Sequence, residues 1–124
     1  MNGDPMLDAV FFRTPSGNEP VRAWLSDLGQ EDANIIDTDI RIVAEHWPQV
    51  LRTSLVKKML SEKQLWEIRS RISEGRRIAR VLFTLEGRRM ILLHGFIKKS
   101  RRTPRKDLRL ARKRRDLIKN GSLS

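Results

Sequence analysis

The sequence contains no cysteine and no tyrosine, and only two of its 124 residues are histidine. Without cysteine the chain can form neither disulfides nor zinc–thiolate sites, and it has no thiol nucleophile. Two histidines alone are too few for a standard zinc ligand set. No apolar run approaches the roughly 18 residues of a membrane span, and residues 1–12 do not resemble a signal peptide. We therefore expect a cytoplasmic protein that needs no metal or other cofactor and binds no membrane.

The chain is short and strongly basic, with a formal charge of +11 at pH 7. Because domains cluster at roughly 100 to 150 residues, we expect residues 1–124 to form a single domain. Residues 1–56 carry four basic and nine acidic residues, whereas residues 57–124 carry 22 basic and six acidic residues. This asymmetry predicts that the second half binds a polyanion, since counterion release from phosphates supplies affinity. One alternative is that the basic residues only keep a small domain soluble. A second is binding to an acidic membrane surface, which is disfavoured because the basic stretch is not fused to an amphipathic face rich in Trp, Phe and Leu.

Hydrophobic periodicity predicts mainly helices in the first half of the chain. A short strand at Ala9–Arg13 is followed by a turn and by an amphipathic helix over about residues 20–28. A second helix is expected over about residues 31–46, where Trp47-Pro48 ends it. Residues 49–64 fit either a broken helix or a loop that packs over a sheet edge.

After residue 64 the apolar period changes to two, which predicts strands. Residues 65–71, 77–84 and 89–99 form three such runs, separated by turn sequences that contain glycine. We expect three antiparallel strands joined by hairpins, then a basic helix with Thr103 as its N-cap and Pro104 in its first turn. The predicted class is α+β, a small antiparallel sheet packed against N-terminal helices with a C-terminal basic helix.

Alternation along these strands gathers polar side chains on one face of the sheet. Trp66 and Ile68 point to the opposite face, toward the helices. On the third strand, regular alternation places Leu93 and Ile97 on the face opposite His94. We expect the polar face to be open to solvent and to present one carboxylate, one imidazole and four cations, from Glu67, Arg69, Arg71, Arg80, His94 and Lys98.

This set of side chains suits RNA cleavage without a metal or a thiol. The 2′-hydroxyl attacks the adjacent phosphorus, a base and an acid move protons, and cations stabilise the phosphorane. Arg69, Arg80 and Lys98 fit the last role, and His94, with a reference pKa of about 6.5, fits proton transfer. Glu67 could orient His94, act as the base or pair with an arginine. A hydrogen-bonded core histidine and a cross-strand ion pair would explain the same residues equally well.

Several segments occur together in an order that is typical of one family. They are GNEPV at 17–21, LWEIR at 65–69, RVLF at 80–83 and LLHGFIKKS at 92–100, followed by Thr103-Pro104. Over nearly the whole chain they resemble the phage-derived HigB-like toxins of the RelE/ParE superfamily. The resemblance implies a RelE-like fold and the toxin of a type II toxin–antitoxin system. Such a toxin is an endoribonuclease that cleaves mRNA on the ribosome until a HigA-like helix-turn-helix antitoxin neutralises it.

The resemblance also implies roles for individual residues. Arg80 is similar to the arginine that stabilises the cleaved phosphate in RelE-type toxins, and Arg69 and Lys98 are similar to their other basic site residues. Glu67 stands where some relatives have lysine. Many relatives transfer a proton with a tyrosine that this chain lacks, so His94 takes that role, or the ribosome and bound cations supply it. We expect Arg80→Ala and His94→Ala to relieve growth arrest without unfolding the protein.

Basic residues around the strands and before the last helix predict an RNA-binding surface. A plain solvated face is the alternative. Two other functions are alternatives. A ParE-like toxin would use the same fold to inhibit DNA gyrase and would cleave nothing, and a phage protein without enzymatic activity would only bind nucleic acid. The predicted RNA-binding residues are Arg71, Arg76, Arg77, Lys99, Arg101, Arg102, Arg105 and Lys106.

Overall fold

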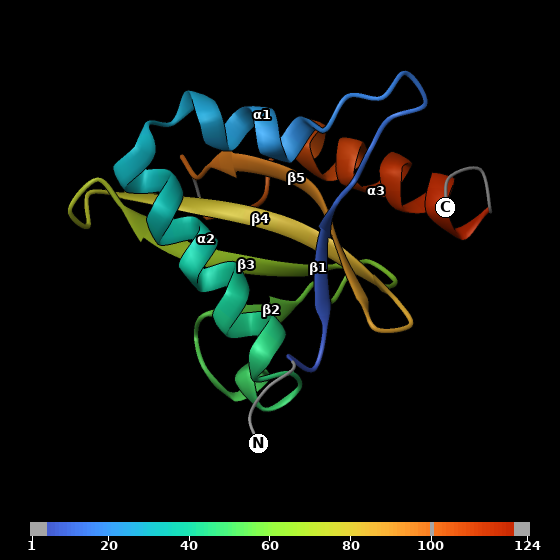
Figure 1. Cartoon of the computed structure of the whole chain (residues 1–124), viewed down its shortest axis with the longest axis horizontal. Helices are drawn as coiled ribbons and strands as arrows, with labels where there is room; N and C mark the ends of the chain where they lie inside the picture. The colour runs from blue at the N-terminus through green and yellow to red at the C-terminus, as the bar shows by residue number, and fades with distance from the viewer. Residues whose placement is uncertain (1–4, 100, 121–124) are drawn as a thin grey trace.

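The computed structural model of the chain describes residues 5–99 and 101–120. Its five strands form one sheet in the order β1-β5-β4-β3-β2 (Figure 1). Strand β1 runs parallel to β5, and the other neighbouring strands are antiparallel, so the sheet is mixed. The strands are β1 Asp8–Phe11, β2 Val56–Lys58, β3 Trp66–Ile72, β4 Arg77–Glu86 and β5 Arg89–Ile97.

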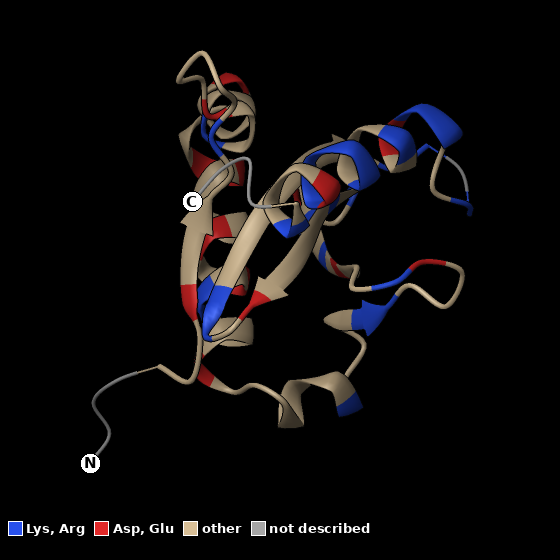
Figure 2. Cartoon of the chain, turned by 90° about the vertical axis from the view of Figure 1, so that its right-hand side faces the viewer, with Lys and Arg blue, Asp and Glu red and all other residues tan. Residues whose placement is uncertain are grey.

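Helices cover both faces of the sheet. Helices α1 (Pro20–Asp27) and α2 (Gln30–Glu45) lie on one face, and α3 (Arg105–Lys119) lies on the other (Figures 1 and 2). A 3-10 helix at Gln49–Arg52 leads from α2 to β2. The expected α+β class is confirmed, and the arrangement is consistent with a RelE-like fold. Within the described residues, no helix combines the length and apolar character that crossing a membrane requires.

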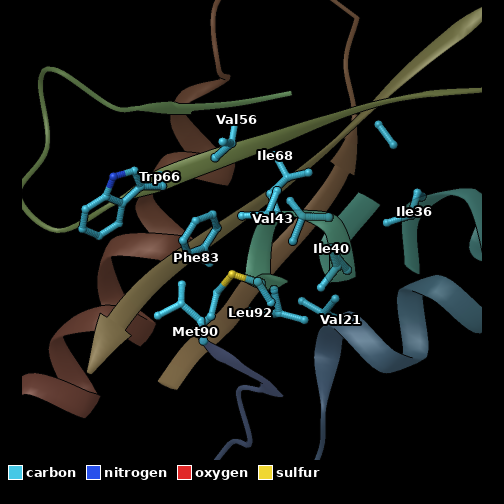
Figure 3. Packing of buried hydrophobic residues seen from close by; sticks show 14 of the residues in the cluster. Val21, Ile36, Ile40, Val43, Val56, Trp66, Ile68, Phe83, Met90 and Leu92 are labelled. Atoms are coloured by element: carbon cyan, nitrogen blue, oxygen red, sulfur yellow. The ribbon is translucent and has the colours of Figure 1, made fainter. Parts of the chain in front are cut away.

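Each face of the sheet has its own hydrophobic core because alternate residues of a strand point in opposite directions. Between the sheet and α1 and α2, side chains such as Val21, Ile36, Ile68 and Phe83 converge (Figure 3). A second cluster lies under α3 and consists of Phe12, Leu65, Leu82, Ile91, Leu93, Phe96, Ala111 and Ile118. Helix α3 is therefore held to the sheet by apolar contacts as well as by its charges.

The expected elements differ from the observed ones at several ends. The first strand lies at Asp8–Phe11 rather than Ala9–Arg13, and residues 49–64 include a short strand, β2, that pairs with β3 at the sheet edge. Thr103 is not the N-cap of α3, because that position belongs to Pro104. The Thr103 hydroxyl instead donates a hydrogen bond to Glu67.

A β-bulge changes which residues of β5 share a face. Leu82 of β4 pairs with His94, but Phe83 pairs with Leu92, so Leu93 is an extra residue in β5. Leu93 belongs to the cluster under α3, and His94 contacts the same helix. The prediction that Leu93 and His94 lie on opposite faces is therefore wrong, since regular alternation does not continue through a bulge.

Candidate functional site

Glu67 and Arg80 form a buried ion pair on the face of the sheet that α3 partly covers. Glu67 is 0% exposed and Arg80 is 2% exposed. Nη1 of Arg80 donates to both carboxylate oxygens at 2.8 Å, and the Thr103 hydroxyl donates to Oε2 at 3.2 Å. The pair is diagonal across β3 and β4, because Arg80 is opposite Arg69 and Glu67 is opposite Leu82. The expectation that Glu67 and Arg80 project into solvent is wrong.

Three cations with greater exposure surround this pair. Nζ of Lys57, on β2, lies 3.9 Å from Oε1 of Glu67, and the Lys57 side chain is 55% exposed. Arg69 is half-buried directly opposite Arg80, which places two like charges in register. Lys98 follows β5, and desolvation together with the neighbouring Arg80 and Arg69 guanidinium groups lowers its pKa. We call Lys57, Arg69, Arg80 and Lys98, with Glu67, the cationic cluster.

The cationic cluster has an excess of positive charge. One carboxylate faces four cations, and the most deeply buried of them, Arg80, uses Nη1 to hold that carboxylate. Lys57, Arg69 and Lys98 therefore remain only partly compensated by Glu67. Such a group of ammonium and guanidinium donors is suited to bind an anion with several oxygens, such as a phosphodiester.

His94 lies on the same face, but α3 covers it. Its Nε2 is 2.6 Å from Oδ1 of Asp107, its Nδ1 is 3.5 Å from Nη1 of Arg114, and its ring stacks on Phe96. Burial lowers the pKa of His94, and the charges of Arg114 and Lys106 act in the same direction against Asp107. The neutral ring that fits both contacts donates from Nε2 to Asp107 and accepts at Nδ1. His94 thus joins β5 to α3, with both nitrogens occupied.

The other predicted RNA-binding residues fall into separate groups. Arg71 is exposed on β3, and together with Arg69 it lines a cavity at the edge of this strand. Arg76 and Arg77 lie at the β3–β4 hairpin, where they pair with Glu74 and Asp32. The remaining members are exposed between the end of β5 and the first turn of α3, namely Lys99, Arg101, Arg102, Arg105 and Lys106.

Positive charge continues along α3. Figure 2 shows Lys and Arg segments along this helix and at β2, on the side of the sheet away from α1 and α2. Arg109, Arg112 and Lys113 are exposed on α3. The cationic cluster is therefore part of a wider basic surface, as the charge asymmetry of the sequence predicts.

Sequence reasoning missed two members of the site. Lys57 lies on a strand of only three residues, too short to show a periodic pattern. Thr103 has the sequence signature of a helix cap, but its side chain contacts Glu67 instead. The one available signal for Lys57 is the basic pair Lys57-Lys58 after an apolar residue.

The comparison with protein families matches most of the chain. A family model described as phage-derived protein Gp49-like covers residues 23–116. The chain belongs to this family. The matched part of this Gp49-like protein includes the whole cationic cluster and His94. No curated protein matches the sequence.

Proposed function

We propose that this Gp49-like protein is the toxin of a type II toxin–antitoxin system and inhibits translation by cleaving mRNA on the ribosome without a metal. The observation that carries the proposal is the cationic cluster, in which three partly exposed cations surround a buried Arg80–Glu67 pair. Membership of a phage-derived family supports it, as does the resemblance to HigB-like toxins in the segments that form the cluster.

In the proposed reaction, the 2′-oxygen bonds to phosphorus and the bond from phosphorus to the 5′-oxygen breaks. The products are a 2′,3′-cyclic phosphate and a 5′-hydroxyl. Lys57, Arg69 and Lys98 bind the phosphate oxygens and stabilise the extra negative charge of the phosphorane. Arg80 and Glu67 are positioning residues in this proposal, because they are buried and fix the strands that carry the exposed cations.

Proton transfer has one suitable donor within the cluster. Lys98 can protonate the leaving 5′-oxygen, and its lowered pKa favours release of that proton. The contacts with Asp107 and Arg114 count against His94 as the donor, and complete burial counts against Glu67 as the base. The base that accepts the 2′-hydroxyl proton then comes from the ribosome, which gives a physical reason for ribosome dependence.

The test is cleavage of a defined mRNA during translation by purified ribosomes, read by mapping new 5′ ends. We expect the parent to cut the mRNA and Lys98→Ala to lower the rate about 100- to 1000-fold, as for the loss of one preorganised charge. Lys113→Ala is the matched control, because it removes the same charge from an exposed position of α3. Intact mRNA with the parent, or equal activity of the two variants, would contradict the proposal.

Expression of the protein in growing bacterial cells distinguishes the gyrase alternative. A ParE-like toxin would induce the DNA-damage response and leave transcripts whole. A nucleic-acid-binding protein without nuclease activity would leave both transcripts and growth unchanged. We expect truncated transcripts and no early DNA-damage response.

The proposed partner is a HigA-like helix-turn-helix antitoxin with an acidic or apolar segment that covers the basic surface. This part of the proposal rests on charge complementarity, because the exposed residues around the cluster and along α3 are mainly basic. If the contact is electrostatic, the affinity of the complex falls as salt rises. An affinity that does not change with ionic strength would exclude this mode of binding.

A further inference from the structure

A cavity of about 490 Å³ opens at the edge of β3, next to the cationic cluster. Strand β2 pairs with β3 only at Trp66–Ile68, so no described strand continues the sheet beside Arg71. The cavity is bordered by α2, by the segment before β2 and by side chains of β3 and β4. Arg69 lines it and is also a member of the cationic cluster. A ligand whose phosphate binds the cluster can therefore place its next group in this cavity.

The walls of the cavity suit a flat aromatic ring. Ile35, Leu55 and Ile78 supply apolar surface, and Arg69 and Arg71 supply guanidinium groups. Proteins that read single-stranded RNA stack unpaired bases on aromatic rings or guanidinium planes and read their Watson–Crick edges by hydrogen bonds. Pockets for extruded bases also use apolar side chains on the faces of the ring. Two arginines also favour a ligand whose backbone is negatively charged.

Asp39 of α2 supplies the acceptor in this cavity. Burial raises the pKa of its carboxyl group, against the opposing effect of a hydrogen bond with the Ser70 side chain, so the ionised group is only partly solvated there. Although Arg69 and Arg71 line the same cavity, no ion pair joins Asp39 to a cation within the described part of the chain. Asp37, two residues earlier on the same helix, is exposed and pairs with Arg41 at 3.4 Å. Asp39 is thus a half-buried carboxylate that has no cationic partner among residues 5–99 and 101–120, in a cavity with cationic walls.

We propose that this cavity binds the base next to the cleaved phosphate and that Asp39 selects guanine. Guanine carries two donors, N1–H and N2–H, side by side on its Watson–Crick edge, and these match the two oxygens of a carboxylate. Adenine and cytosine place a ring-nitrogen acceptor there, and uracil flanks its single N–H with carbonyl acceptors. The inference rests on the proposed nuclease function, because it takes the bound phosphate to belong to RNA.

Binding of short RNAs tests the inference without requiring cleavage. The probes are uridine hexamers that carry one central guanine, adenine or cytosine and are 2′-O-methylated so that no attack can occur. We expect the guanine hexamer to bind the parent about 10-fold more tightly than the other two. Asp39→Asn should remove this preference and keep the affinity for all-uridine RNA, whereas Asp37→Asn should keep the preference. Equal binding of all hexamers by the parent, or an unchanged preference in Asp39→Asn, would overturn the inference.

Mapping of cleavage sites separates this inference from the proposed function. If the parent cuts mRNA at positions with no guanine at a fixed distance, the guanine site is wrong and the nuclease proposal stands. If the parent cuts no mRNA, the nuclease proposal fails, and the hexamer comparison still decides the cavity. Asp39→Asn should fold, because burial already disfavours the ionised carboxyl group that the amide replaces. Thermal unfolding of both variants checks this.

Discussion

Replacing Arg80 with alanine should strongly destabilise the protein. The substitution leaves the Glu67 carboxylate in a site with 0% exposure, where the Thr103 hydroxyl and Lys57 at 3.9 Å are its remaining partners. Breaking a buried ion pair by removing one partner costs about 3–5 kcal/mol. The whole stability of a domain of this size is about 5–15 kcal/mol. We therefore expect Arg80→Ala to lose about 3–5 kcal/mol, so that much of the protein unfolds under mild denaturing conditions.

The assay is urea unfolding followed by tryptophan fluorescence, since Trp66 is buried in the core beside Phe83. The control is the double variant Glu67→Leu/Arg80→Met. Replacing both partners of a buried pair by apolar side chains is often neutral or stabilising, so the double variant should recover most of the loss. An unfolding midpoint of Arg80→Ala close to that of the parent would refute the reasoning. So would a double variant as unstable as the single one.

This prediction replaces the one that the sequence alone supports. From the sequence, Arg80→Ala should relieve growth arrest without unfolding the protein. Because Arg80 is buried, relief of growth arrest by this variant would not show that Arg80 touches RNA. Whether the cationic cluster contacts RNA is better tested by replacing an exposed member of the cluster, in a variant that still folds.

Three further outcomes follow from the structure. Lys98→Ala should change the free energy of unfolding by less than about 0.5 kcal/mol. A loss of several kcal/mol in the same urea titration would show that Lys98 stabilises the fold, so that a lower cleavage rate of this variant would not identify Lys98 as a site residue. Because burial lowers the pKa of His94 in the folded state, its contribution to stability should be present above the unfolded pKa of about 6.5 and be lost as pH falls through the folded pKa. His94→Gln should remove this slope, and an NMR midpoint above 6.5 for the ring would show that Asp107 dominates instead. Gly95→Ala places a Cβ 2.3 Å from Cε3 of Trp24 and should lower the free energy of unfolding by about 1–3 kcal/mol. An unfolding midpoint at the same urea concentration as that of the parent would contradict this packing.

The sequence predicts most of the fold because its long elements are strongly periodic. The three long strands and the second helix lie within a few residues of their predicted positions. The parallel pairing of β1 with β5 has no such signal, because four residues do not specify a partner strand. Strand β2 has no sequence signal either, since its three residues give no periodicity.

For the site, the sequence predicts which residues share a face but not how deeply each is buried. Alternation correctly groups Glu67, Arg69 and Arg80. Their depth depends on how α3 and its preceding segment pack, as shown by the Thr103 hydroxyl that contacts Glu67. The position of His94 depends on a β-bulge, and no residue pattern in β5 predicts this bulge.

Helix α3 divides this face of the sheet into two chemically different parts. Over β5, the helix supplies Asp107 and Arg114, which satisfy both nitrogens of His94 and leave that part closed. Toward β2, the cluster leaves Arg69 directly opposite Arg80, an arrangement that like-charge repulsion disfavours unless an anion lies between or above them. Glu67 offsets only part of this repulsion, since its carboxylate is already bound by Arg80 on the neighbouring strand. A bound phosphate would relieve the remaining repulsion, and for this physical reason the proposed function places RNA over β3 and β4 rather than at the histidine.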